Sequence, residues 1–174
     1  FRRSDHPNMS KTTTKRSRKL QTQNATAGKK FASKYGYFTP DGREYVITRP
    51  DTPRPWVNVI SNGEYGVIET QTGSGFSWLD NSNLSRITRW DQDLIRANWG
   101  KYIYLRDRDS GKFWSGTWKP CMTKYDLFEV RHGQGYTVTT TKLNGIKFEK
   151  TVFVDVEDPG EVWKVVLTNE TSKK

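Results

Sequence analysis

The sequence predicts an all-β protein built as an antiparallel β-sandwich, and three observations support this fold class. Nine short blocks rich in β-branched and aromatic residues are separated by turn-forming Gly, Pro, Asn and Asp. Seven Trp, eight Tyr and eight Phe give 13% aromatic residues, which suit pleated, half-buried surfaces. No helical period of apolar residues separates the blocks, which argues against a βαβ arrangement.

The predicted strands follow one another from residue 43 to residue 168. In chain order they are Arg43–Thr48, Trp56–Ile60, Tyr65–Gln71, Gly75–Leu79, Lys101–Arg106, Tyr125–Arg131, Tyr136–Leu143, Ile146–Val154 and Glu161–Thr168. Only Asp91–Asn98 is compatible with a short helical turn. The Pro-rich stretch Arg49–Pro55 is predicted to be an extended connector, because each Pro disfavours the α region for the residue before it.

The clearest local signal is the pair Asn144-Gly145 between two predicted strands. Both residues tolerate positive φ, which a two-residue type I′ hairpin requires. In the strand that follows, one face is predicted to carry Ile146, Phe148, Val152 and Val154.

Both faces of the last predicted strand are partly apolar, and this strand ends about six residues before Lys174. Because a sandwich that stops there leaves an unprotected edge, we interpret the domain as truncated.

The charge divides the chain into two parts, residues 1–34 and residues 35–174. The whole chain carries a formal charge of +10, and residues 1–34 hold ten Lys or Arg against one acid, Asp5. This first segment has too few apolar groups to offset its chain entropy, so we predict a disordered basic tail. The remaining residues are nearly neutral and are predicted to form the sandwich.

The sequence lacks the motifs that are typical of several functional classes of protein. No apolar run approaches the roughly 18 residues of a membrane span, and no Walker loop, HExxH or GxSxG motif is present. With two His and one Cys, neither a His-based metal site nor a disulfide framework is expected. The acids are plentiful, but their spacing singles out no catalytic pair.

Aromatic residues next to Arg, Asn and Asp indicate a carbohydrate surface. Sugars present apolar C–H faces, which aromatic rings cover, and hydroxyl groups, which planar amide, carboxylate and guanidinium groups bind. Arg89-Trp90 lies in a polar segment, where a structural Trp is least needed. For most other Trp residues a core position is the stronger interpretation. Arg131-His132 begins a Gly-rich loop that is equally compatible with a functional and a structural role.

Ordered blocks of the sequence resemble the opening of the family 94 glycoside phosphorylases. That family comprises cellobiose and chitobiose phosphorylases and the C-terminal region of cyclic β-1,2-glucan synthases. The similar blocks are Tyr35–Phe38, Arg43–Ile47, Arg49–Asn58, Asn62–Gly66, Gly73–Trp78, Arg86–Trp90, Tyr102–Asp107, Trp114-Ser115 with Trp118 and Pro120, Arg131–Gly133 and Gly135–Thr137. Together they cover about residues 35–170, and their shared order is more specific than any one block.

The resemblance implies an N-terminal sandwich of the supersandwich type, followed by a helical linker and an (α/α)₆-barrel that carries the catalytic acid. The parent enzyme would be a cytoplasmic homodimer that uses inorganic phosphate as co-substrate and needs no cofactor. Its substrate would be a β-linked disaccharide or oligosaccharide. The chain itself would hold no catalytic group, and no nucleic-acid or membrane partner is expected.

The candidate carbohydrate-binding or interface residues are Arg86, Arg89, Trp90, Arg131 and His132. Two alternatives stay open. A self-standing carbohydrate-binding module would bind oligosaccharides without any barrel domain. A nucleic-acid binder would use residues 1–34, and its binding would depend on salt.

Overall fold

The computed structural model describes residues 28–91 and 96–172. Within these ranges the regular structure consists of β-strands alone. The strands are β1 (Gly36–Phe38), β2 (Glu44–Ile47), β3 (Val57–Ser61), β4 (Tyr65–Thr70), β5 (Ser77–Leu79), β6 (Tyr104–Arg106), β7 (Phe113–Ser115), β8 (Leu127–Gly133), β9 (Tyr136–Leu143), β10 (Ile146–Val154) and β11 (Glu161–Asn169). The described part of the chain contains no helical segment with the length and apolar composition of a membrane span.

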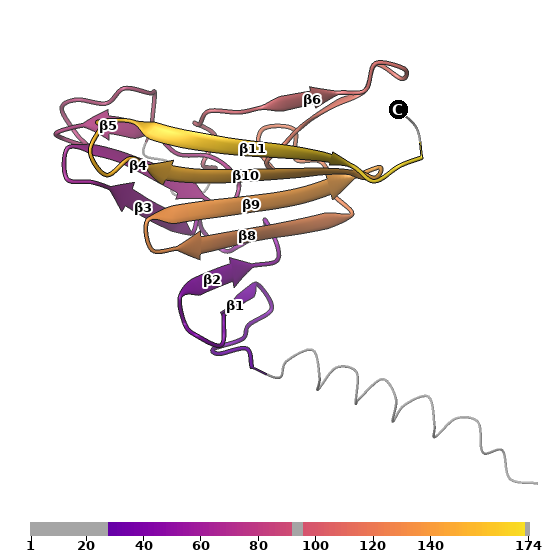
Figure 1. Ribbon diagram of the computed structural model, residues 1–174, viewed down its shortest axis with the longest axis horizontal. Helices are drawn as coiled ribbons and strands as arrows, with labels where there is room; N and C mark the ends of the chain where they lie inside the picture. The colour runs from indigo at the N-terminus through magenta and orange to yellow at the C-terminus, as the bar shows by residue number, and fades with distance from the viewer. Residues whose placement is uncertain (1–27, 92–95, 173–174) are drawn as a thin grey trace, which may run out of the picture.

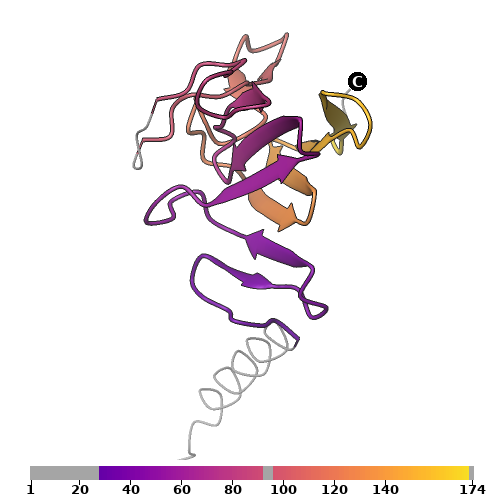
Figure 2. The same ribbon diagram turned by 90° about the vertical axis from the view of Figure 1, so that its left-hand side faces the viewer.

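The strands form three antiparallel sheets. The largest has the order β1-β2-β8-β9-β10-β11, and the smaller sheets are β3-β4-β5 and β6-β7. Strands β8 to β11 run side by side, with the three-stranded sheet behind one end of them (Figure 1). Seen from that end, β1 and β2 lie below the other strands, at one edge of the largest sheet (Figure 2). The predicted all-β antiparallel sandwich is therefore confirmed.

Each of the nine predicted blocks overlaps one strand, although β3, β8 and β11 end one or two residues later than predicted. Two strands were missed. These are β1 and β7, each only three residues long, which leaves too little sequence for an alternating pattern to show. The predicted helical turn at Asp91–Asn98 lies partly outside the described residues. Residues 1–27 of the predicted tail lie wholly outside them. Lys30, which lies within the predicted tail, exchanges two backbone hydrogen bonds with Phe38.

The β9–β10 hairpin has the predicted geometry. Its central residues Asn144 and Gly145 have φ values of 50° and 77°, as a type I′ turn requires. On β10, Phe148, Val152 and Val154 share the buried face, as predicted. The same face also carries Lys150, which is only 1% exposed and which the apolar pattern did not explain.

The core lies between β4 and the end of the large sheet. Val67 on β4 and Val152 on β10 are fully buried in one cluster that also contains Ile60, Tyr65 and Val154. Side-chain amides fix the two layers at their rims. Asn58 on β3 donates to the carbonyl oxygens of Gly133 and Tyr136 at 2.9 and 2.8 Å, and Asn62 donates to that of Asp155 at 2.9 Å.

A buried ion pair crosses the same interior. The Nζ atom of Lys150 lies 3.1 and 3.3 Å from the two carboxylate oxygens of Glu69 on the facing sheet. Beside it, Lys101 contacts Glu161, and the Ser77 hydroxyl donates to the Glu161 carboxylate at 3.0 Å. These charged groups satisfy one another between the layers, which a buried charge requires.

Strand β11 is an edge strand. It pairs with β10 along its whole length, and no other described strand pairs with it. Val165 and Leu167 are 38% and 55% exposed, although they pair with the buried Lys150 and Phe148 and so lie on the inward side. The described layers therefore leave part of the inner face of this edge uncovered.

Candidate functional site

The segment that carries Arg86, Arg89 and Trp90 folds back onto β5. Asn81 organises the turn, because its side-chain oxygen accepts the backbone N–H groups of Asn83 and Leu84 at 2.9 and 3.0 Å. The returning chain is then fixed to Ser77, whose carbonyl oxygen accepts the N–H of Ile87 at 2.9 Å. This reversal places residues 86–90 beside the aromatic residues that precede them.

Three arginine–aromatic contacts result, and we call the residues that make them the arginine–aromatic cluster: Phe76, Arg86, Arg89, Trp90 and Trp99. The Arg86 guanidinium lies 4.9 Å from the ring centre of Trp90 and 5.5 Å from that of Phe76. The rings of Phe76 and Trp90 are 4.8 Å apart. Arg89 lies 4.0 Å from the ring centre of Trp99. The structure thus brings Arg86 and Trp90 into direct contact and places Arg89 on a neighbouring indole.

The cluster presents guanidinium groups more than open aromatic faces. Arg86 and Arg89 are exposed, whereas Trp90 is half-buried and Phe76 is only 4% exposed. Part of the Arg86 guanidinium fixes the loop, because Nε donates to the carbonyl oxygen of Ser82 at 2.9 Å. An arginine over an aromatic ring is held at a fixed angle, and its outer N–H groups can bind hydroxyl or carboxylate oxygens.

Arg131 and His132 lie on strand β8 of the large sheet, and the predicted loop is reduced to the turn at Gln134-Gly135. The Arg131 Nε donates to Glu129 at 2.8 Å and its Nη1 to Glu44 at 2.9 Å, and Glu44 also accepts the Tyr136 hydroxyl at 2.6 Å. These hydrogen bonds raise the pKa of Arg131 above its usual range. Its charge is therefore already matched by two carboxylates within the protein.

His132 packs between the connector and the sheet. Its Nε2 lies 3.3 Å from the carbonyl oxygen of Trp56, and its Nδ1 lies 3.0 Å from the Thr137 hydroxyl. A neutral ring satisfies both contacts, with Nε2–H donating and Nδ1 accepting. Burial lowers the pKa of His132 to about 4. Arg131 and His132 are adjacent in sequence but are held by separate contacts within the protein.

The low pKa of His132 predicts a loss of stability in mild acid. An unfolded His titrates near pH 6.5, so below that pH the unfolded chain binds a proton that the folded chain does not. The contribution of the neutral His132 to the free energy of unfolding is complete above about pH 6.5 and is lost as the pH falls toward 4. At 1.36 kcal/mol per pH unit, the loss reaches about 3 kcal/mol. Denaturant unfolding at pH 7 and pH 5 should show about 2 kcal/mol more loss in the wild type than in His132→Gln. Equal losses in the two proteins would contradict a neutral, partly buried His132.

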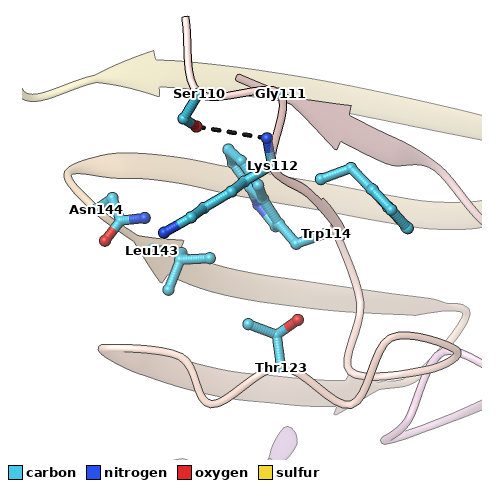
Figure 3. Close-up of a pocket in the computed structure, with 8 residues that line it drawn as sticks. Ser110, Gly111, Lys112, Trp114, Thr123, Leu143 and Asn144 are labelled. Atoms are coloured by element: carbon cyan, nitrogen blue, oxygen red, sulfur yellow. Dashed lines mark hydrogen bonds between the residues drawn. The ribbon is translucent and has the colours of Figure 1, made fainter. Parts of the chain in front are cut away.

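A cavity of about 470 Å³ opens between the β6–β7 turn and the β9–β10 hairpin. In Figure 3 the Lys112 side chain extends toward Asn144 and Leu143, with Trp114 behind it and Thr123 opposite. Trp114 is buried, whereas the neighbouring Phe113 is 64% exposed. The cavity combines an apolar floor with an amine, an amide and hydroxyl groups. No local sequence pattern predicts this cavity, because its two sides come from hairpins about 30 residues apart.

Among the described residues, neither the arginine–aromatic cluster nor the cavity beside Lys112 forms a self-contained catalytic centre. Within residues 28–91 and 96–172, no group of three or more His, Cys, Asp or Glu side chains is arranged to hold a metal ion. The buried Glu69 pairs with Lys150, the partly buried Glu161 pairs with Lys101, and neither acid lines the cavity described above. The arginine–aromatic cluster offers binding groups and no acid–base pair.

Comparison with known proteins places these features in a family context. Residues 43–174 match the family model of the glycosyl hydrolase 94 supersandwich domain. The chain is 37% identical over 142 residues to N,N'-diacetylchitobiose phosphorylase of Vibrio proteolyticus, covering 80% of this chain and 18% of that protein. It is 36% identical over 143 residues to solabiose phosphorylase of Paenibacillus borealis, with the same two coverages.

A relative of a different kind matches the same region. The cyclic beta-(1,2)-glucan synthase of Rhizobium meliloti is 32% identical over 145 residues, which is 82% of this chain and 5% of the synthase. The chain therefore spans less than a fifth of the length of each of these three relatives.

Proposed function

Because the chain belongs to glycosyl hydrolase family 94, through the supersandwich domain of that family, we propose that it is the sandwich part of an inverting glycoside phosphorylase. The substrates of the parent protein are a β-linked disaccharide or oligosaccharide and inorganic phosphate, and one product is a sugar 1-phosphate. The observation that carries the proposal is the family match over residues 43–174, together with relatives named as phosphorylases.

The proposal assigns the chemistry to a part of the parent outside this chain. In an inverting reaction a carboxylic acid protonates the leaving glycosidic oxygen, and the second reactant attacks the anomeric carbon from the opposite face. Phosphate takes the place of the activated water of an inverting hydrolase, so no cofactor is needed. The acid would lie in an (α/α)₆-barrel domain, and the sandwich would support the barrel and a homodimer in the cytoplasm.

The arginine–aromatic cluster is the part of this chain proposed to face the sugar or the neighbouring domain. Arg86 and Arg89 are exposed and are oriented by Trp90 and Trp99, which favours recognition of hydroxyl or carboxylate groups. Arg131 and His132 are better explained as supports, since their polar atoms are already bonded within the protein.

Calorimetric titration of the 174-residue chain with β-linked disaccharides and oligosaccharides tests the proposal that this chain forms only part of the sugar site. One half of a sugar site should bind at most weakly, with a Kd of about 1 mM or above. Substituting Trp90→Ala should weaken any measurable binding further, and Phe31→Ala, an exposed aromatic residue outside the cluster and both cavities, should not. Micromolar affinity that is lost in Trp90→Ala would instead support a self-standing carbohydrate-binding module and overturn the scaffold proposal.

A further inference from the structure

A second cavity, of about 220 Å³, lies between the Pro-rich connector and the chain around Trp118 and Lys119. At roughly 30 Å³ per water molecule, it has room for about seven waters. This is below the usual range of about 300–1,000 Å³ for drug-sized ligands. A ligand that fills it is therefore small, no larger than a monosaccharide derivative.

Hydrogen bonds fix the wall of this cavity, with the buried Gln71 at their centre. The side chain of Gln71, only 2% exposed, accepts the backbone N–H of Trp56 at 2.8 Å and donates to the Thr52 hydroxyl at 2.5 Å. Thr52 in turn donates to the carbonyl oxygen of Arg54 at 2.7 Å. The Lys119 N–H donates to the Thr72 carbonyl oxygen at 2.9 Å. The connector and the opposite wall are therefore held in place before any ligand arrives.

The rim of the cavity is strongly basic. Arg54, Arg96 and Lys119 line it, and Asp51 is its single acidic lining residue. The Asp51 carboxylate is already held by Arg49, whose Nε and Nη2 donate to it at 2.9 and 2.5 Å. The acid at this rim is thus neutralised by a cation that does not line the cavity.

Two of the lining cations have no anionic partner within the described part of the chain. The exposed Arg54 guanidinium makes no hydrogen bond or ion pair there. The Lys119 Nζ has only neutral neighbours, Asn98 Oδ1 at 3.0 Å and Met122 Sδ at 3.7 Å. It also lies 5.4 Å from the ring centre of Trp118, which forms the apolar side of the cavity.

We propose that this cavity binds a phosphoryl group, as inorganic phosphate or on a phosphorylated monosaccharide, with Arg54 and Lys119 as its ligands. A guanidinium and an ammonium beside a rigid wall provide charge-assisted hydrogen bonds to the oxygens of an anion. Trp118 provides a surface for the apolar face of an attached sugar. The site is separate from the arginine–aromatic cluster and does not depend on the role proposed for that cluster.

NMR titration of the full chain at constant ionic strength tests the proposal, with inorganic phosphate, glucose 1-phosphate and glucose as probes. Site-resolved shifts separate this cavity from the basic residues of the N-terminal segment. Saturable shifts of the Gln71, Thr72 and Lys119 amides are expected with phosphate or glucose 1-phosphate. Arg54→Gln and Lys119→Gln should each weaken binding about ten-fold, and the exposed control Arg108→Gln should leave it unchanged.

The three probes distinguish the two sources of the phosphoryl group. Tighter binding of glucose 1-phosphate than of phosphate assigns the site to a phosphorylated sugar, and equal binding assigns it to inorganic phosphate. Saturation by glucose alone would contradict an anion site. Absence of saturable shifts, or equal weakening in Arg108→Gln, would show only diffuse surface charge and would overturn the proposal.

Discussion

Replacing Lys150 by Met is expected to lower the free energy of unfolding by about 3–5 kcal/mol. The change leaves the Glu69 carboxylate buried without the ammonium group that lies 3.1 and 3.3 Å from its two oxygens. Burial already raises the pKa of Glu69, so the unpaired carboxyl group will take up a proton or draw in water. Since small domains are stable by only about 5–15 kcal/mol, guanidinium unfolding should show a large shift of the midpoint.

Two further variants separate the ion pair from a general effect of losing a lysine. Lys147→Met removes a partly exposed lysine that lies 3.1 Å from Glu149 on the same strand, and it should cost at most about 1 kcal/mol. Combining Lys150→Met with Glu69→Leu removes both buried charges and should recover much of the lost stability. If Lys150→Met were as mild as Lys147→Met, Lys150 and Glu69 would not be paired in the interior.

The second large effect is expected for Phe148→Ala, also at about 3–5 kcal/mol. Phe148 is 1% exposed, and its ring packs so closely on Gly116 that a Cβ added there would lie 2.4 Å from it. Removing the ring leaves a cavity beneath Gly116, in the chain that follows β7. The Thr141 hydroxyl, which donates to the Gly116 carbonyl oxygen at 2.7 Å, also holds that chain in place. Chemical denaturation measures the loss directly.

Phe113→Ala is the matched control, because the same atoms are removed from a side chain that is 64% exposed. We expect that control to change stability by no more than about 0.5 kcal/mol. Similar costs for Phe113→Ala and Phe148→Ala would mean that the inner face of β10 is not packed as the structure shows.

Most of the strand framework could be predicted because its signals are local. Asn144-Gly145 specifies its own turn, and the alternation from Phe148 to Val154 is visible within one strand. Lys150 could not be interpreted from that alternation, because its partner Glu69 lies 81 residues away. A lysine within an apolar stripe does signal a buried ion pair, but only the fold identifies the acid.

The candidate site could be predicted only in part, for the same reason. Arg86 and Trp90 are near neighbours in sequence, whereas their contact with Phe76 depends on the turn organised by Asn81. The sequence around His132 does not indicate its partial burial, which follows from the connector that places the Trp56 carbonyl oxygen against its ring. Cavities assembled from separate loops leave no pattern in the sequence, and both were found from the structure.

The most direct measurement of the central claim is a phosphorolysis assay on the 174-residue chain. The chain is incubated with inorganic phosphate and a panel of β-linked disaccharides, with the Vibrio proteolyticus relative on N,N'-diacetylchitobiose as the positive control. We expect sugar 1-phosphate from the relative and none from the chain, because the proposed acid lies in another domain. Phosphate-dependent turnover by the purified chain would contradict its assignment as a binding and supporting sandwich.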